Sequence, residues 1–409
     1  MRRWQRTILA GWLWVLAVPG ASAQVLTEAQ ALERMRAEYP QAQVLALRVR
    51  ELEASTRERS LLANPTFSYT REDAGPATDD FFVVTQELPL RGRLGLLGDA
   101  AEHAVTAAAA RVDADLLTFE TDLRLAFADL LLSQERIAAL EDGLAALNRL
   151  VEVLRTREEA GEGSSFDRLR AEREVADVAL DLDTVMIDRL KAQVGLGAFF
   201  APGSDPTRLN AAGRLVDDTA VPALDLLVSQ ALSRRSDYRA LGLEGTRWDT
   251  ESRAAKRLRF PEAAVAAGVK RSAGANTTDS GYAITASVSI PLFNRGQAQV
   301  ARAEAGVARV HAERRVLGTQ IESEVRAAHA AASRYGSLVD RYRVASVERA
   351  IELVAIATAA YEEGEYGILE LLDAHRVKLD AQLRLLGLST AARHASIALD
   401  AAVGGGATP

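Results

Sequence analysis

The chain of 409 residues repeats itself once, and this duplication constrains its fold more than any other feature. Three marks occur in each half, in one order and about 200 positions apart: Asn64-Pro65 and Phe260-Pro261, Leu88-Pro89-Leu90 and Ile290-Pro291-Leu292, and the glycine-bearing segments 157–163 and 361–367. Solenoid repeats are only ~20–50 residues long. The sequence therefore predicts two similar halves of one architecture.

Each half has the same predicted order of elements: a helical stretch, two short alternating runs, a very long helix, a glycine break and a returning helix. The long helices cover residues 94–160 and 297–363, and at ~1.5 Å per residue each would be about 100 Å long. Leu123, Leu130 and Ile137 recur at heptad spacing. Apolar residues at this spacing predict helices that pack side by side along their length.

The predicted strands have a period of two. In residues 281–290, Tyr282, Ile284 and Val288 share one face, and small polar residues such as Thr285 occupy the other. The length fits a transmembrane barrel strand of ~9–11 residues, although a single strand of this kind also fits an ordinary half-buried sheet. Four strands are too few to close a pore, and an open sheet edge in lipid is prohibitively unfavourable. A barrel would therefore need several chains.

The first residues have the pattern of a cleaved signal peptide. Residues 1–23 contain three arginines, an apolar run at 8–18 and Ala-Ser-Ala at 21–23. The chain has no cysteine, which excludes disulfides, thiolate metal ligands and the acylated cysteine of a lipoprotein. Its net charge of −7 argues against binding to nucleic acid. We expect an exported protein without a lipid anchor.

The composition and the repeat together predict a division of the chain. The predicted parts are a signal peptide (1–23), a first repeat (24–198) with strands at about 66–72 and 80–89 and a helical hairpin at about 94–197, a linker (199–222), a second repeat (223–403) with strands at about 262–271 and 280–290 and a hairpin at about 297–403, and a disordered tail (404–409). The helical stretches that open the two repeats are expected at about 27–62 and 223–258.

One segment carries a family resemblance. Residues 360–376, Ala-Tyr-Glu-Glu-Gly-Glu-Tyr-Gly-Ile-Leu-Glu-Leu-Leu-Asp-Ala-His-Arg, resemble the most recognisable segment of the TolC family of outer-membrane efflux ducts. Asn64-Pro65 before the first strand and residues 291–296, Pro-Leu-Phe-Asn-Arg-Gly, after the fourth are also similar to that family. The resemblance extends from about Thr27 to Val403.

The resemblance implies a mainly α fold with a small β part. In such a homotrimer each chain gives four strands to one outer-membrane β-barrel, which a periplasmic α-helical barrel continues. The implied function is a passive outer-membrane duct, with a periplasmic extension, of a tripartite efflux system. Its partners would be a periplasmic adaptor (membrane fusion) protein, an inner-membrane pump of the RND type and outer-membrane lipid. Two alternatives stay open: a type I secretion duct of the same family, and an exported periplasmic coiled-coil adaptor or structural protein that forms no pore.

The substrate is open at this stage. Residues 64–69 and the missing lipid cysteine resemble the branch of the family that exports cobalt, zinc and cadmium, while drugs, other small solutes and polypeptides remain alternatives. No enzyme site or cofactor site is expected, because the sequence has no His-Glu-x-x-His pair and no phosphate-binding glycine loop. The five histidines are expected to be solvated helix residues, and no metal site is predicted.

The resemblance also implies a gate at the periplasmic aperture. Glu370 and Asp373 match the family's acidic rings at the periplasmic entrance, and in a trimer each would recur three times around the axis. Tyr361 matches the family's gating tyrosine, and Asp167 matches its acidic partner on the neighbouring hairpin. The arginine of the family's latch is missing, since Tyr366 occupies its position. The alternatives are two solvated carboxylates and a tyrosine of the helical seam.

The glycine breaks are expected at the far periplasmic tips of the two hairpins. In both halves a glycine is followed by a glutamate, as Gly161-Glu162 and Gly364-Glu365. Glycine permits the positive φ that reverses a helix, so a bare turn is the alternative to a functional tip. The retained glutamates favour docking sites for the hairpins of an adaptor.

Overall fold

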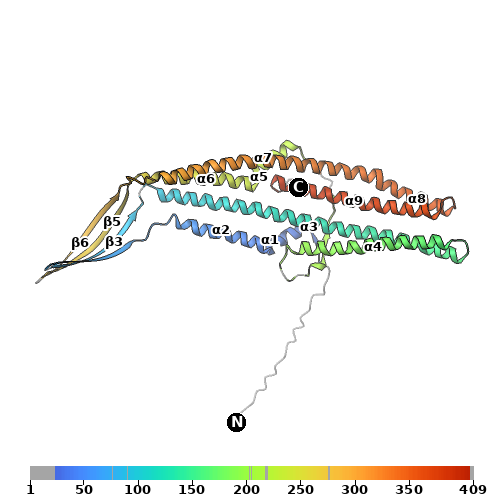
Figure 1. Cartoon of the computed structure of the whole chain (residues 1–409), viewed down its shortest axis with the longest axis horizontal. Coiled ribbons are helices and arrows are strands. Elements are labelled where there is room, and N and C mark those ends of the chain that lie inside the picture. The colour runs from blue at the N-terminus through green and yellow to red at the C-terminus, as the bar shows by residue number, and fades with distance from the viewer. Residues whose placement is uncertain are drawn as a thin grey trace, which may run out of the picture.

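The computed structural model describes residues 24–75, 77–89, 91–201, 203, 205–216, 220–274 and 277–405. The molecule is elongated, with a sheet at one end and helices along the rest of its length (Figure 1). The predicted signal peptide, 1–23, lies outside the described residues. The same holds for Leu90, for most of the predicted tail (406–409), and for positions 202, 204 and 217–219 of the predicted linker.

The four predicted strands form one antiparallel sheet in the order β2-β3-β5-β6. Their bounds are Thr66–Ala74 for β2, Ala77–Leu88 for β3, Glu262–Ala273 for β5 and Thr278–Ser289 for β6. They differ from the predicted ranges by a few residues at the ends. The central pairing of β3 with β5 joins the two halves of the chain, so the duplication produces one continuous sheet with β2 and β6 as its edges.

The two long helices leave the sheet from equivalent points. α3 covers Arg93–Glu159 without interruption. Its counterpart is α7, Gln297–Tyr342, followed by a π-helical segment, Arg343–Glu348, and by α8, Arg349–Glu362. The predicted long helical run over 297–363 is thus continuous to Glu362, and the π-helical segment within it was not predicted. A π turn accommodates an extra residue, and here Val347 and Ala350 remain buried together with Ala381.

The remaining helices are shorter and lie either between the sheet and mid-length (α1, α2, α5 and α6) or in the far half of the molecule (α4 and α9) (Figure 1). They are α1 (Glu28–Glu38), α2 (Pro40–Glu58), α4 (Ser165–Gly197), α5 (Leu224–Arg234), α6 (Ser236–Lys256) and α9 (Ile368–Val403). The single stretches predicted at 27–62 and 223–258 are each two helices. Tyr39 is extended because Pro40 follows it. Arg235 also leaves the helical region, and its guanidinium pairs with Asp237.

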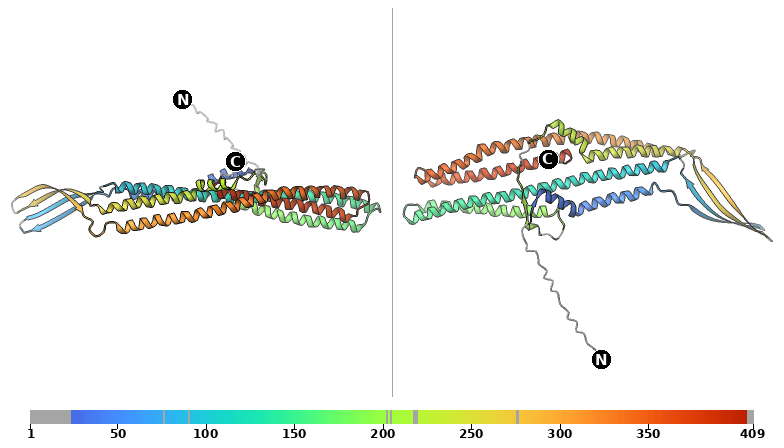
Figure 2. Two further views of the ribbon diagram at one scale, coloured as in Figure 1. Left: turned by 90° about the horizontal axis from the view of Figure 1, so that it is seen from above. Right: turned by 180° about the vertical axis from the view of Figure 1, so that it is seen from behind.

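The helices lie side by side in a single layer (Figures 1 and 2). α3 runs along the whole layer, as do α7 and α8 taken together. Near the sheet the order of packing is α2-α3-α6-α7, and in the far half it is α4-α3-α9-α8. Of the ten residues in the two heptad rows of α3, Ala126 and Leu144 are half-buried and the other eight are buried: Leu123, Leu130, Ser133, Ile137, Leu140, Leu147, Val151 and Leu154. A single helical layer leaves both of its faces exposed, whereas a globular domain packs at least two layers around a core.

The predicted linker 199–222 contains regular structure, which the sequence analysis missed. A 3-10 turn, Pro206–Arg208, leads into β4, Leu209–Ala212, and β4 pairs in parallel with β1, Gln24–Thr27. The Gln134 side chain both donates to and accepts from the Ala211 backbone, at 2.9 and 2.8 Å. Leu209 and Ala211 are buried in a core at mid-length of the molecule.

A partly buried ionic network joins α1 to the last helix, α9. Arg124 of α3 donates to Glu28 of α1 at 2.7 Å and to Asp400 of α9 at 3.1 Å. Arg393 of α9 also donates to Glu28. The network holds α1, α3 and α9 together at the level of the mid-length core.

Candidate functional site

The sheet has one apolar and one polar face. Directly paired residues share a face, and two such rows cross the whole sheet: Phe67–Val84–Ala267–Ile284 and Tyr69–Phe82–Val269–Tyr282. Tyr282 and Ile284 are 87% and 78% exposed. Neither the described helices nor a second sheet covers this apolar face. The sheet therefore exposes an apolar band that has no partner within the described part of the chain.

The outer limit of the apolar band is aromatic. The rings of Tyr69 and Phe82 lie 5.0 Å apart, and the next row toward the strand turns contains Arg71, Asp80 and Arg271. Aromatic side chains between an apolar band and charged residues are typical of the interfaces of membrane β-barrels.

The opposite face of the sheet carries small and polar residues. Its rows include Thr66–Thr85–Ala266–Thr285 and Glu72–Asp79–Ser272–Asp279. Asp79 accepts from the Lys270 ammonium group at 2.7 Å and from the Ser272 hydroxyl. A polar face of small side chains is suited to line an aqueous channel.

Both glycine breaks form the same reversal at the end of the molecule opposite the sheet (Figure 1). Gly161 and Gly364 have φ values of 77° and 79°. The Glu162 backbone N–H donates to the Arg157 carbonyl at 2.9 Å, and the Glu365 N–H donates to the Ala360 carbonyl at 2.8 Å. These bonds define a Schellman motif, in which glycine supplies the left-handed residue. The glycines are thus required by the turn itself, while both glutamate side chains are exposed.

The predicted acidic pair of the aperture lies just beyond the second tip. Glu370 is in the first turn of α9, Asp373 follows one turn later, and both side chains are exposed. Asp167 is in the first turn of α4, which the Ser164 side chain caps by accepting from the Phe166 N–H at 3.1 Å. All three carboxylates therefore lie within the last helical turns of the end opposite the sheet.

Tyr361 is half-buried against the apolar seam of the far half. The guanidinium of Arg157 lies over its ring at 5.4 Å. Within the described chain Tyr361 makes no hydrogen bond to Asp167. The contact of Arg157 with Tyr361 has no signal in the sequence, because it depends on which face of α3 is turned toward α8.

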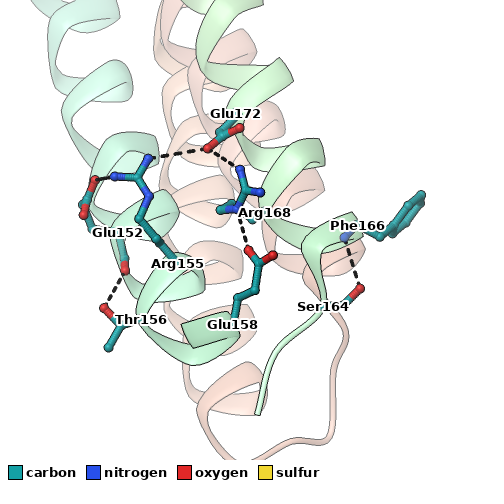
Figure 3. Close-up of polar contacts among 8 residues, drawn as sticks. All are labelled: Glu152, Arg155, Thr156, Glu158, Ser164, Phe166, Arg168 and Glu172. Atoms are coloured by element: carbon teal, nitrogen blue, oxygen red, sulfur yellow. Dashed lines mark hydrogen bonds and ion pairs between the residues drawn. The ribbon is translucent and has the colours of Figure 1, made fainter. Parts of the chain in front are cut away.

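The first tip is held by a ladder of charges (Figure 3). Arg168 of α4 donates to Glu158 of α3 at 2.5 Å and to Glu172 at 2.8 Å. Arg155 of α3 reaches Glu172 at 3.6 Å and Glu152 at 3.0 Å. The hydrogen bond from Arg168 is the main cause that lowers the pKa of Glu172. The helical spacing of Arg168 and Glu172 is visible in the sequence, but the bonds between the two helices are not.

The second tip has no such ladder at the equivalent positions. Tyr361 stands where the first half has Glu158, and Leu371 stands where it has Arg168. Leu371 is buried in the apolar cluster of the far half. The two hairpins thus have the same turn, but polar bonds fasten one and apolar packing fastens the other.

Four of the five histidines are partly buried, which corrects the expectation of solvated residues. Burial, followed by the charges of Lys378 and Arg149, lowers the pKa of His375. No cluster of histidine and carboxylate side chains that could hold a metal ion occurs among the described residues. In the same part of the chain, every helix is too short or too polar to span a membrane.

The model of the outer membrane efflux protein family matches residues 82–199 and 227–405. The chain therefore belongs to the outer membrane efflux protein family, which confirms the resemblance seen in the sequence and places the protein in the outer membrane. The family is defined by efflux and not by a catalysed reaction.

Two relatives show the similarity within the family. The chain is 27% identical over 308 residues to the nickel-cobalt-cadmium resistance protein NccC of Alcaligenes xylosoxydans xylosoxydans, a match that covers 70% of this chain and 65% of NccC. It is 24% identical over 372 residues to the cobalt-zinc-cadmium resistance protein CzcC of Cupriavidus metallidurans, which covers 86% of this chain and 84% of CzcC.

Solved channels have the same fold. The outer-membrane channel OprN superposes with a TM-score of 0.72 at 18% identity, over 93% of this chain and 91% of OprN. The outer membrane protein VceC of Vibrio cholerae superposes with a TM-score of 0.71 at 19% identity, over 93% of this chain and 97% of VceC. The mainly α fold with a small β part is thus confirmed as that of these outer-membrane proteins.

Proposed function

We propose that the protein is the outer-membrane duct of a tripartite efflux system and works as a homotrimer. The observation that carries this proposal is a single helical layer continuous with a sheet that has an exposed apolar face and two unpaired edges. Lipid does not tolerate unpaired strand edges. Pairing β6 of one chain with β2 of the next closes the sheet, and the same arrangement closes the helical layer into a tube.

The lateral edge of the helical layer supports this assembly. α4 forms one edge in the far half and exposes a row of large apolar side chains at helical spacing: Phe166, Leu169, Leu180, Ile187, Leu190 and Val194. On the other edge α8 exposes Ile351 and Ile356. Exposed apolar side chains on both edges fit the packing of one chain against the next along the helices.

The substrates that we propose are divalent transition-metal cations. Relatives of this chain are named for resistance to nickel, cobalt, zinc and cadmium. A duct must release what it conducts, and the chain contains no cysteine, the softest metal ligand. Glu370 and Asp373, repeated around a trimer axis, would attract cations at the periplasmic entrance.

The gate and the tips complete the proposal. Tyr361 would stabilise the closed aperture through a charge-assisted hydrogen bond to Asp167, of ~1.5–3 kcal/mol. The tips at Gly161-Glu162 and Gly364-Glu365 would meet the hairpins of a periplasmic adaptor, which connects the duct to an inner-membrane pump of the RND type. Space is available at both glycines, since a Cβ placed there has no neighbour within 4 Å.

Two pairs of substitutions at the tips test the docking proposal, and one of them preserves the turn. Asn tolerates a left-handed backbone, so Gly161→Asn with Gly364→Asn keeps the reversal and adds only a small side chain. Gly161→Trp with Gly364→Trp adds bulk. We expect the tryptophan pair to abolish efflux at equal protein level and the asparagine pair to retain most of it. Equal export by both pairs would place docking elsewhere on the helical tube.

The function itself is tested in cells that lack their own metal-efflux duct. Expression of the chain together with a periplasmic adaptor and an inner-membrane pump of the RND type should restore growth in cobalt, zinc or cadmium. The purified protein should run as a trimer and conduct ions in planar bilayers. Export of a polypeptide in place of metals would indicate a type I secretion duct. A periplasmic protein without conductance would indicate a coiled-coil adaptor or structural protein.

A further inference from the structure

A cationic and aromatic collar surrounds the base of the sheet. Its members come from the loops that join strands to helices in both halves of the chain: Arg91, Arg257, Arg259, Phe260, Phe293 and Arg295. We call this set the junction collar. It lies directly beyond the last residues of β3 and β6 and before the first residue of β5, where α3 and α7 begin.

Contacts between the loops bring the collar together. The guanidinium groups of Arg91 and Arg259 lie over the ring of Phe260, at 4.6 and 4.8 Å from its centre. Gly296 packs so closely on the preceding segment that a Cβ there would lie 2.8 Å from the side chain of Leu258. The loop that carries Phe293 and Arg295 is therefore held beside the segment that carries Arg257 and Arg259.

The arginines of the collar lack acidic partners. Among the described residues, no carboxylate lies within ion-pair distance of Arg91, Arg257, Arg259 or Arg295, and all four side chains are exposed. The neighbouring cations are neutralised, since Arg93 pairs with Glu262 at 3.5 Å and Lys256 with Glu304 at 3.0 Å. The four arginines of the collar therefore keep their positive charge on the exposed surface.

Two helix N-termini add to this positive charge. α3 and α7 begin at Gly92 and Gly296, with no side-chain cap and no acidic residue in the first turn. By contrast, α1, α4, α5, α6 and α9 each carry an acidic residue there. α2 also lacks one, but it begins at a proline directly after α1. Free N–H groups at a helix N-terminus favour an anion.

The backbone of Arg91 is an outlier of the kind that marks functional sites. Its φ of 77° is the one positive value found at a residue other than glycine within the described chain. A left-handed conformation is unfavourable for a residue that carries a side chain, and such strain persists where the surroundings require it. The guanidinium of this strained residue lies over the ring of Phe260.

Exposed apolar side chains lie next to the collar. Ile290, Leu292 and Phe293, directly after β6, are 65%, 62% and 91% exposed. Ile290 continues the apolar face of the sheet, which includes Val288, the partner of Ala263 one row before the end of β6. Aromatic and basic side chains that follow the end of an apolar band are positioned at the depth of lipid headgroups.

We propose that the junction collar binds the phosphate groups of anionic phospholipids in the periplasmic leaflet of the outer membrane. This inference rests on the proposed insertion of the sheet as a barrel. Arg91 and Arg259 bind the phosphodiester, the N-termini of α3 and α7 reinforce the field, and Leu292 and Phe293 contact the acyl region. The bound lipids fix the depth of the barrel in the membrane.

Native mass spectrometry of the purified trimer tests this inference, with dioleoylphosphatidylglycerol compared against dioleoylphosphatidylcholine. The variant is Arg91→Gly combined with Arg259→Gln, since glycine takes the positive φ at position 91 without strain. The matched control is Arg173→Gln, which removes a highly exposed arginine of α4 far from the sheet. We expect the parent and the control to retain phosphatidylglycerol preferentially, and the variant to lose about fivefold in retention per arginine removed.

Three outcomes overturn the inference. Equal retention of phosphatidylglycerol by variant and parent removes the collar as its site. Displacement of the lipid by inorganic phosphate at equal concentration assigns the site to a free anion. If the variant changes the anion selectivity of the conductance but not the retention of lipid, the arginines lie in the lumen of the channel and not against the membrane. A parent that forms no conducting trimer contradicts the proposed function instead, so the two failures are distinguishable.

Discussion

Replacing Arg124 by alanine should weaken the attachment of α1 and α9 to α3 at mid-length of the molecule. The Arg124 side chain is 19% exposed, and that of Asp400, one of its two partners, is only 4% exposed. Removal of one member of a buried ionic network costs about 3–5 kcal/mol. Glu28 keeps its bond from Arg393, so we expect a value near the lower limit, about 3 kcal/mol.

Arg36→Ala is the matched control for this change. Arg36 of α1 pairs with Glu120 of α3 at 2.7 Å, the same distance as between Arg124 and Glu28, but its side chain is 62% exposed. An exposed ion pair contributes at most about 1 kcal/mol. The two pairs between α1 and α3 have the same N···O distance, but Arg124 is more buried than Arg36 and has a second partner in Asp400 of α9.

Amide hydrogen exchange of the trimer in detergent measures the local opening free energy directly. With Arg124→Ala, the protected amides of α1 and of the end of α9 should exchange about 100-fold faster, because each 1.36 kcal/mol corresponds to a factor of ten. With Arg36→Ala, the change should remain below about fivefold. Equal exchange in the two variants would refute the argument that burial sets the strength of this network.

Three further predictions concern the end of the molecule opposite the sheet. Glu370→Ala combined with Asp373→Ala should weaken the block of single-channel current by divalent cations, and unchanged block would contradict an acidic ring. Tyr361→Phe should raise the conductance of the closed state without changing trimer stability, and equal conductance would exclude the tyrosine from the gate. The lowered pKa of Glu172 means that its contribution to stability is present above the unfolded pKa of about 4.3 and is lost as pH falls through the folded value. Exchange protection at the first tip should therefore be constant from about pH 8 to 6 and fall below about pH 4, and Glu172→Gln should remove that fall; a fall that persists in the variant would assign it to other groups.

Much of the fold could be predicted because its signals are local. The heptad residues of α3, such as Leu123 and Leu140, are buried as their spacing indicates. The alternation in 281–290 correctly placed Tyr282, Ile284 and Val288 on one face, since a strand has a period of two whatever its partner. The glycines at the tips were found because a left-handed turn strongly favours that residue.

The errors arose where structure depends on distant parts of the chain. β1 and β4 are four residues each, too short for a periodic signal, and they exist because residues far apart in sequence pair with one another. The break at Pro40 had a clear local signal that the prediction of one helix over 27–62 ignored. The π-helical segment at 343–348 has no proline or other sequence mark that identifies it.

The candidate site likewise has one part that could be predicted from local sequence and one part that could not. Glu370 and Asp373 could be placed on one exposed helix face from their spacing alone. The contact of Arg157 with Tyr361 and the bond of Arg168 to Glu158 depend on how separate helices are turned toward each other. Spacing within one helix carries no information on that rotation.

Cross-linking between neighbouring chains tests the central claim, that three copies close one barrel. The sequence contains no cysteine, so a pair placed on the two edge strands is the only thiol pair present. Suitable pairs combine Ser68→Cys on β2 with Ala283→Cys, Thr285→Cys or Ser287→Cys on β6. Within one chain β2 and β6 are separated by β3 and β5, about 14 Å apart at ~4.8 Å per strand step, which is too far for a disulfide.

Oxidation of the outer-membrane protein followed by denaturing electrophoresis gives the result. The account predicts that at least one pair forms a covalent species of three chains and that this species does not grow further, because a closed ring leaves no free edge. A ladder of ever larger oligomers, or monomers alone for every pair, would contradict the closed trimeric duct.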